Sequence, residues 1–170
     1  IAAASRRAAN VLAAAGVVPG DRLVLLLGRQ IAWWEVLTAC LRMGAVASPG
    51  TAQLSAKDLA FRINAAQATC VVTDTGNAAK VDAVLGQCPG LKVRILVDGP
   101  REGWIDYATA VRAASEAFVT VDSAAHDEAL CYFTSGTTGH PKMCMHAHSY
   151  DGCHNTTVLG GRELGLSYLQ

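Results

Sequence analysis

The sequence predicts an α/β fold, with layers of mostly parallel sheet covered by helices on both faces. Short apolar runs of strand length alternate with segments of helical periodicity along most of the 170 residues. Groups rich in glycine and proline separate these segments, as in successive βαβ units. One of the predicted strands runs straight into a glycine-rich loop. No internal repeat or low-complexity linker interrupts the pattern.

The first three predicted helices follow from apolar spacing and capping residues. The first helix stops near Gly16 and carries its apolar residues at helical spacing: Ala4, Ala8, Val11, Leu12 and Ala15. The second ends near Gly44 and has a predicted apolar face: Trp33, Trp34, Leu37, Cys40 and Leu41. Ser55 and Asp58 form a capping-box pattern that begins the third, which carries Leu59, Arg62 and Ile63.

Later helices are predicted over residues 77–85 and 107–118, and another is expected to begin at Ser149. The predicted strands are apolar runs bounded by turn residues: 23–27, 69–73, 93–97, 129–133 and 143–148. Turn-forming residues break the chain between these elements at 19–21, 48–50, 88–90 and 98–100.

Composition excludes several classes of protein. The 14 basic residues balance the 14 acidic ones, and no basic stretch predicts nucleic-acid binding. No apolar run reaches the roughly 18–20 residues of a transmembrane segment. The six cysteines are too sparse for a small disulfide scaffold and predict free thiols in a reducing compartment: Cys40, Cys70, Cys88, Cys131, Cys144 and Cys153. The chain begins within a helical pattern at Ile1 and ends at Gln170 without a terminal turn, so we expect a piece of a longer protein.

The most informative segment follows the strand 129–133. Nine residues combine hydroxyl groups, two glycines, a proline and a lysine: Thr134, Ser135, Gly136, Thr137, Thr138, Gly139, His140, Pro141 and Lys142. Glycines let backbone N–H groups approach a phosphate, and the hydroxyls add further donors. Lys142 can bring a compact positive charge to phosphoryl oxygens. The segment therefore predicts a phosphate-binding loop.

The two most common glycine-rich nucleotide loops do not fit this segment. In the pattern G-x-x-x-x-G-K-[ST] counted from Gly136, Pro141 would occupy the second glycine position and Met143 the magnesium-binding hydroxyl position. The dinucleotide pattern G-x-G-x-x-G is also missing. Small P-loop kinases and dehydrogenases are therefore disfavoured.

The segment from Tyr132 to Lys142 resembles the signature loop of the AMP-forming adenylating enzymes, which include acyl-CoA synthetases, luciferases and peptide-synthetase adenylation domains. Medium-chain acyl-CoA synthetases are the most similar group, and the likeness runs from about Ser5 to His148. Further matching positions are scattered along the chain: 20–22, 33–34, 40–44, 49–51, Gln53, Asp58, Arg62, Met143 and His146.

The resemblance implies that residues 1–170 are part of the large N-terminal AMP-binding domain of an adenylate-forming enzyme, with the remainder of that domain and a C-terminal domain absent. The implied reaction joins a carboxylic acid to ATP, releasing diphosphate, and coenzyme A then displaces AMP to give the acyl-CoA. ATP, Mg²⁺ and coenzyme A are the implied cofactors and co-substrates. The nine residues from Thr134 to Lys142 match the motif that contacts the ATP phosphates.

No catalytic residue of the family falls within residues 1–170, which are therefore expected to be inactive alone. The alternative is a non-catalytic truncated relative that acts as a nucleotide-binding or interaction module. Expected partners are a small-molecule carboxylic acid, ATP and coenzyme A, without nucleic acid and with the oligomeric state open. The expected location is intracellular: the cytoplasm of a bacterium or the mitochondrial matrix of an animal.

Three other groups have competing interpretations, and a fourth has one. Alternation places Cys144, His146 and His148 on one face of a strand, with Cys153 and His154 nearby. A zinc site is conceivable there, but no closed zinc spacing is present and a half-buried strand is preferred. Residues 33–34 are expected to pack in the core rather than face a ligand or partner. Residues 126–128 could serve acid–base chemistry but are expected to form a polar loop. Arg6 and Arg7 are expected on a solvated helix face.

Overall fold

The computed structural model describes residues 1–134 and 141–149. These residues form a seven-stranded sheet of strand order β5-β4-β3-β1-β2-β6-β7. The strands are β1 (Arg22–Leu26), β2 (Val46–Pro49), β3 (Cys70–Thr73), β4 (Val93–Leu96), β5 (Ile105–Asp106), β6 (Glu128–Thr134) and β7 (Lys142–Ala147). Neighbouring strands pair in parallel except β6 and β7, which are antiparallel. The predicted α/β class with a mostly parallel sheet is confirmed.

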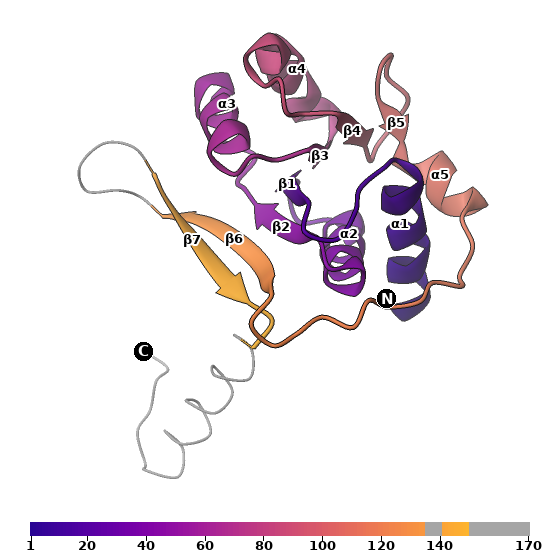
Figure 1. Ribbon diagram of the computed structural model, residues 1–170. Helices are drawn as coiled ribbons and strands as arrows, with labels where there is room; N and C mark the ends of the chain where they lie inside the picture. Colours follow the sequence, from indigo (N-terminus) through magenta and orange to yellow (C-terminus); the bar gives the residue numbers. More distant parts are fainter. Residues whose placement is uncertain (135–140, 150–170) are drawn as a thin grey trace, which may run out of the picture.

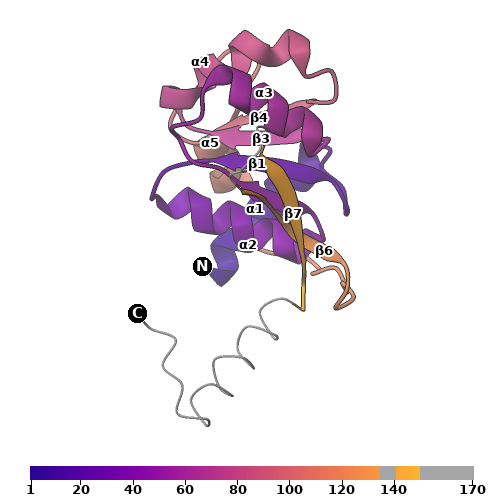
Figure 2. The ribbon, with the colours of Figure 1, turned by 90° about the vertical axis from the view of Figure 1, so that its left-hand side faces the viewer.

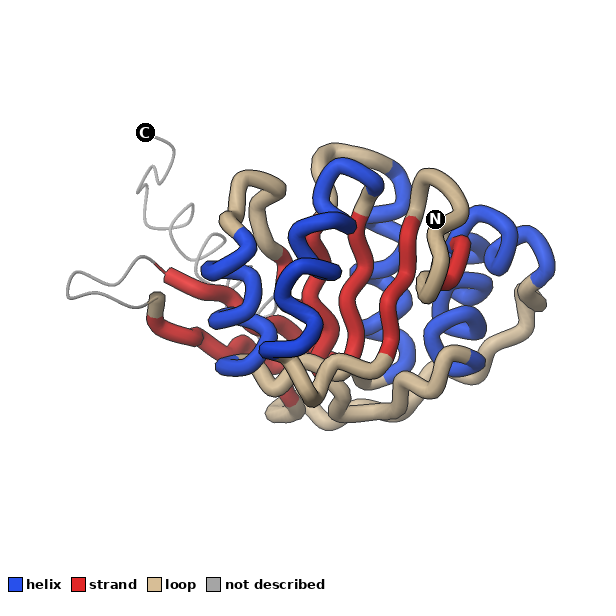
Figure 3. Tube along the Cα trace, turned by 90° about the horizontal axis from the view of Figure 1, so that it is seen from above, coloured by secondary structure: helices blue, strands red, loops and turns tan. Residues whose placement is uncertain are grey.

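Helices cover both faces of the sheet (Figures 1 and 3). They are α1 (Ala2–Ala14), α2 (Ile31–Met43), α3 (Ala56–Ala65), α4 (Thr75–Val84) and α5 (Tyr107–Ala113), with a 3₁₀ turn at Leu85–Gln87. In Figure 2 the sheet is seen nearly edge-on, with α3 and α4 on one side and α1 and α2 on the other. Helix α5 packs beside α1.

The central strand β1 builds a hydrophobic core on each face. Leu23 and Leu25 point to the face covered by α1, α2 and α5, whereas Val24 and Leu26 point to the face covered by α3 and α4. Successive strand side chains alternate between faces, so a strand covered on both sides needs an uninterrupted apolar run. This explains the run of aliphatic residues that predicted the strand.

Helix α2 buries only part of the predicted face: Cys40 is buried, and Trp33 and Leu37 pack against the core. Its buried residues are Val36, Ala39, Cys40 and Met43, at spacings of three, one and three, which is one helical face. Trp34 is instead 56% exposed. The prediction gave most weight to the large aromatic residues, but the close approach of α2 to α1 is made by small and medium side chains.

The structure adds two strands that the sequence reading missed. Strand β2 occupies Val46–Pro49, where a chain break was predicted at 48–50. Its four residues end in a proline, a residue that cannot donate to a sheet ladder and that usually argues against a strand. Strand β5 has only two residues, Ile105 and Asp106, which is too short for an alternation pattern.

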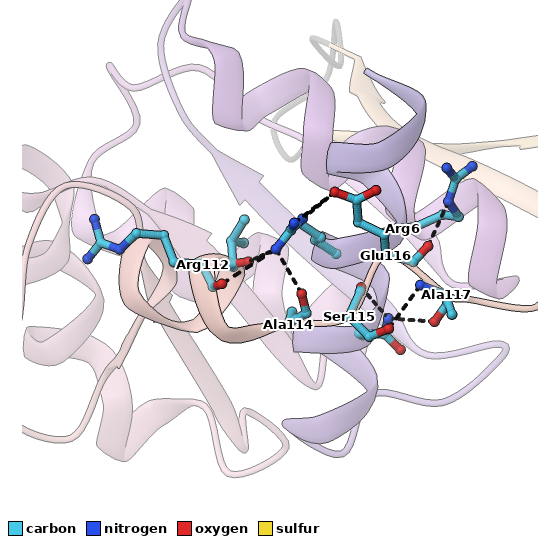
Figure 4. Close-up of polar contacts among 9 residues, drawn as sticks. Arg6, Arg112, Ala114, Ser115, Glu116 and Ala117 are labelled. Atoms are coloured by element: carbon cyan, nitrogen blue, oxygen red, sulfur yellow. Dashed lines mark hydrogen bonds and ion pairs between the residues drawn. The ribbon is translucent and has the colours of Figure 1, made fainter.

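Helix α5 ends at Ala113, so the prediction of a helix over 107–118 is wrong beyond that residue. The chain that follows is held against α1 by side chains (Figure 4). Arg7 donates to the Ala114 carbonyl at 2.9 Å and pairs with the Glu116 carboxylate at 2.7 Å. Arg6 donates to the Glu116 carbonyl at 2.8 Å, and Asn10 donates to the carbonyls on either side of it. The expectation that Arg6 and Arg7 only face solvent is therefore wrong.

The predicted N-cap of α3 is confirmed. The Asp58 backbone N–H donates to Ser55 Oγ at 3.1 Å, and the Ser55 hydroxyl donates to the Asp58 carboxylate at 2.6 Å. The predicted helix from Ser149 onward lies outside the described residues apart from Ser149 itself. In the parts of the chain that the structure describes, no helix has the length and apolar character to span a membrane.

The described cysteines are free, as predicted, and they differ sharply in accessibility. Cys40, Cys70, Cys88 and Cys131 are buried, and Cys144 on β7 is exposed. Burial raises the pKa of Cys40 to about 12 and raises those of Cys70, Cys88 and Cys131. The thiolate is the reactive form, so these four thiols are protected from reagents both by burial and by their raised pKa values.

We expect a water-soluble maleimide at mild alkaline pH to modify Cys144 at least about tenfold faster than the four buried thiols. Peptide mapping of the folded protein over time measures each rate, and a sample unfolded in denaturant is the control in which the rates converge. Rapid labelling of Cys40 or Cys70 in the folded state would contradict the packing of the core covered by α1, α2 and α5.

Candidate functional site

Strands β6 and β7 bring the two ends of the predicted phosphate-binding segment together. Thr134 is the last residue of β6 and Lys142 the first of β7, and the two are registered opposite one another. The Thr134 hydroxyl donates to the Lys142 carbonyl at 3.4 Å. Lys142 is exposed, so its ammonium group is accessible to a ligand. The antiparallel pair therefore fixes where the segment leaves the sheet and where it returns.

The remaining predicted site residues divide into two groups. Pro141 lies directly before β7 and is partly buried. Six predicted contacts lie outside the described residues: Ser135, Gly136, Thr137, Thr138, Gly139 and His140. The structure therefore places three of the nine predicted residues: Thr134, Lys142 and Pro141, which directly precedes Lys142.

The segment leaves the sheet at the edge where α/β proteins bind ligands. Strand β6 runs parallel to β2, with Ala47 opposite Leu130, and β2 runs parallel to β1. The carboxyl ends of these three strands therefore meet at one edge. Ligands of open α/β sheets bind at this edge, because the loops there are free to vary while the strands hold them in place.

Aromatic side chains pack on both faces of the hairpin near this edge. On one face the Arg62 guanidinium lies 5.0 Å from the centroid of the Phe133 ring, and Phe61 meets the same ring edge-to-face at 6.3 Å. On the other face, the Tyr132 and His146 rings pack edge-to-face at 5.5 Å. The sequence placed Arg62 on a helix, but no spacing pattern linked that helix to Phe133, which lies 71 positions later.

An ion pair connects the first residue of β6 to the central strand β1. Arg22 on β1 pairs with Glu128 at 3.0 Å and donates to the Ala66 carbonyl at 3.2 Å. The pair is partly exposed, so its net contribution to stability is small. Its geometric effect is to connect the start of β6 with β1 and the end of α3.

A separate hollow of about 710 Å³ opens at the carboxyl ends of β1 and β2. Trp33 and Trp34, whose rings meet edge-to-face at 4.7 Å, line it with Arg29 and with residues 51–53. Trp33 also packs against the core, but Trp34 is largely exposed. The expectation that both tryptophans are core residues is therefore wrong for Trp34.

Two other groups carried competing interpretations from the sequence. In residues 1–134 and 141–149, no three His, Cys, Asp or Glu side chains gather as a metal site would require, and Cys153 and His154 lie outside these ranges. His126 is 89% exposed and stands 3.9 Å from Asp127 in the loop before β6. Asp127 accepts a hydrogen bond from the Ala124 N–H at 2.8 Å, which is a turn contact.

These features define an α/β protein in which a glycine- and hydroxyl-rich segment leaves the carboxyl edge of a mostly parallel sheet. The chain belongs to the AMP-binding enzyme family, whose model matches residues 1–164. This result and the fold confirm the resemblance inferred from residues 132–142.

Curated relatives are acyl-coenzyme A synthetases. The chain is 47% identical over 150 residues to the Mus musculus protein "Acyl-coenzyme A synthetase ACSM5, mitochondrial", a match that covers 87% of this chain and 26% of the relative. It is 42% identical over 146 residues to the Homo sapiens protein "Acyl-coenzyme A synthetase ACSM1, mitochondrial", covering 85% and 25%. The chain thus spans about a quarter of the length of the curated relatives it matches.

Solved structures share the fold. ATP-bound MatB from Rhodopseudomonas palustris superposes with a TM-score of 0.81 at 30% identity, over 94% of this chain and 31% of that one. The anthranilate CoA ligase AuaEII, crystallised with anthranoyl-AMP, superposes with a TM-score of 0.87 at 22% identity, over 94% and 31%. At that identity the second match is a likeness of fold alone.

Proposed function

We propose that this chain is part of an ATP-dependent acyl-CoA synthetase that converts a carboxylic acid, ATP and coenzyme A to acyl-CoA, AMP and diphosphate. The observation that carries the proposal is the segment 134–142 in a member of the AMP-binding enzyme family. Its described ends, Thr134 and Lys142, face each other at the ligand-binding edge of the sheet.

The proposed role of the segment is to bind the phosphates of ATP. Carboxylate attack on the α-phosphate makes diphosphate the leaving group, and negative charge develops on it as the bond breaks. Donors held in place before the reaction stabilise this charge without having to reorganise. We assign this role to the backbone N–H groups and hydroxyls of residues 134–139 and to the ammonium of Lys142.

Magnesium ion is the implied companion of ATP, but the described residues do not provide a site for it. No cluster of carboxylates forms in residues 1–134 and 141–149. Lys142 suits phosphate oxygens rather than a divalent cation, because its ammonium group is itself a cation and has no lone pair to donate to a metal. The proposed steps therefore rest on this chain's own donors.

The proposed substrate is a medium-chain fatty acid or related carboxylic acid, and the proposed compartment is the mitochondrial matrix. The compartment is supported by the curated relatives, whose names describe mitochondrial acyl-coenzyme A synthetases. The chain length is supported by the scattered positions that resemble medium-chain acyl-CoA synthetases. Within residues 1–170 the proposed chemistry is confined to phosphate binding, so we propose that this segment alone does not turn over.

The full-length protein that contains this chain should catalyse carboxylic-acid-dependent exchange of labelled diphosphate into ATP. We expect the rate to be highest with medium-chain acids and acyl-CoA to form once coenzyme A is added. Exchange with residues 1–170 alone should stay at background, and a fluorescent-ATP titration of that segment should show only weak binding. ATP binding by the full-length protein without exchange for any acid in a broad panel would favour the non-catalytic module.

A further inference from the structure

We propose that Arg62 is a positioning residue for ATP binding, acting through Phe133 to hold the ends of the phosphate-binding segment, Thr134 and Lys142, against the sheet. The inference rests on the proposed function of that segment. It concerns a contact between helix α3 and strand β6, and Arg62 itself is not assigned any contact with ATP.

The backbone of the sheet leaves the far end of β6 without a neighbour on the β2 side. Leu130 is opposite Ala47, and β2 ends two residues later at Pro49. Phe133 and Thr134 therefore extend past the end of β2. Over this stretch β6 pairs with β7, which is itself the outer strand of the described sheet. Backbone pairing alone would let the hairpin pivot about its base.

Helix α3 provides the lateral contact that β2 does not. The Arg62 guanidinium carbon lies 5.0 Å from the Phe133 ring centroid, and the Phe61 ring meets Phe133 at 6.3 Å with an interplanar angle of 67°. Phe133 is the residue directly before Thr134. In Figure 1 the far end of the β6–β7 hairpin lies on the α3 side of the sheet. Arg62 thus contacts the residue that directly precedes Thr134, the first proposed ATP contact.

The surroundings of Arg62 suit contact with an aromatic ring better than a hydrogen-bonded ion pair. Its Nε is buried and has no hydrogen-bond partner among the described residues. Burial lowers the Arg62 pKa, opposed by the charge of Asp58, and arginine remains protonated at any physiological pH. Asp58 is itself bonded to Ser55. A guanidinium held in this way is stabilised by the electron-rich face of Phe133.

The consequence for the reaction is a change in ATP binding rather than in the chemical step. Loss of the contact would widen the range of positions that Thr134 and Lys142 adopt before ATP binds. ATP binding would then have to order them, which weakens affinity, whereas the bound geometry and its chemistry would be largely restored. We expect Arg62→Ala to raise KM for ATP about three- to tenfold with kcat within about twofold of the parent.

The test uses the full-length protein and acid-dependent ATP–diphosphate exchange. Arg62→Ala and Arg62→Met remove the charge, the latter keeping most of the side-chain length, and Arg62→Lys restores a cation. Phe133→Leu removes the ring, and the double variant Arg62→Ala with Phe133→Leu measures coupling. Asn64→Ala is the matched control: it lies on the same helix and loses a 2.9 Å hydrogen bond to the Gln87 carbonyl, away from Phe133.

We expect a raised KM for ATP in Arg62→Ala and Arg62→Met, and recovery of most of the ATP affinity in Arg62→Lys. The double variant should show no further rise in KM beyond that of the single variants. Hydrogen exchange of residues 130–134 should also be faster in Arg62→Ala, a readout independent of activity. An unchanged KM, or the same increase in Asn64→Ala, would overturn the positioning role. If the parent catalyses no ATP–diphosphate exchange at all, the proposed function has failed. Faster hydrogen exchange of residues 130–134 in Arg62→Ala would still report the contact.

Discussion

Replacing Lys142 with alanine in the full-length protein is expected to slow acyl-adenylate formation by about 100- to 1,000-fold. The ammonium group is proposed to stabilise charge on the departing diphosphate, and removing one such donor from an active site typically has this effect. Thermal stability should hardly change, because the Lys142 side chain is exposed. ATP–diphosphate exchange and a thermal melt of the same preparations measure the two quantities.

Two further variants make the Lys142 result specific. Lys142→Arg keeps the charge but changes its shape and hydration, so partial activity is expected. Lys57→Ala removes an exposed lysine from α3, outside the proposed site, and should exchange at the parental rate. Parental exchange in Lys142→Ala would remove the phosphate role from this residue, whatever the remainder of the segment does.

Replacing Asp82 with alanine is expected to lower the free energy of unfolding by about 2 kcal/mol. Its carboxylate accepts hydrogen bonds from Trp104 Nε1 at 3.0 Å and Arg94 at 3.2 Å, and it pairs with Arg101 at 2.6 Å. Trp104 is only 8% exposed, so its indole N–H would lose its acceptor inside the protein. The loss is no larger because water reaches the two arginines and weakens their attraction to the carboxylate.

The same contacts predict a pH dependence. Burial raises the Asp82 pKa, but hydrogen bonds from Arg101 and Trp104 and the charges of Arg101 and Arg94 outweigh it, so the pKa is lower than in the unfolded chain. A depressed folded-state pKa contributes stability above the unfolded value of about 3.9, and this contribution is lost as pH falls through the folded value. The gap between parent and Asp82→Asn should therefore be constant near neutral pH and close below about pH 4.

Denaturant titrations at several pH values measure this gap. Glu102→Ala is the matched control, because Glu102 is an exposed acidic residue in the same stretch of chain as Arg101 and Trp104. It should unfold like the parent at every pH. A gap between parent and Asp82→Asn that persists unchanged at low pH would show that the carboxylate charge is not what stabilises the cluster.

Local sequence was sufficient to predict the central part of the fold. The aliphatic run of β1 and the capping pair Ser55 and Asp58 each determine a structure through neighbouring residues, by burial on two faces and by hydrogen bonding across one turn. The position of the candidate site followed in the same way, from a strand running into residues 134–142. These features depend on residues close in sequence, so their patterns are visible in a single chain.

Elements that depend on distant partners were not predictable in this way. Strand β2 is short and ends in Pro49, and it is held in place by β1 and β6 rather than by its own propensity. Helix α5 ends early, and the chain after it is bonded to Arg7 and Asn10 of α1, more than 100 positions away. Trp34 is exposed because α2 turns a different face toward α1.

The sequence by itself determined the α/β class, the motif that we propose binds phosphate and, through that motif, the family. Only the tertiary structure decided where the motif lies: Thr134 is opposite Lys142, and Phe133, the residue before Thr134, contacts Arg62 of α3. The physical reason is that a glycine- and hydroxyl-rich segment is recognisable from its own residues. The contact that we propose orients it joins side chains 71 positions apart, which only the packing of α3 beside β6 brings together.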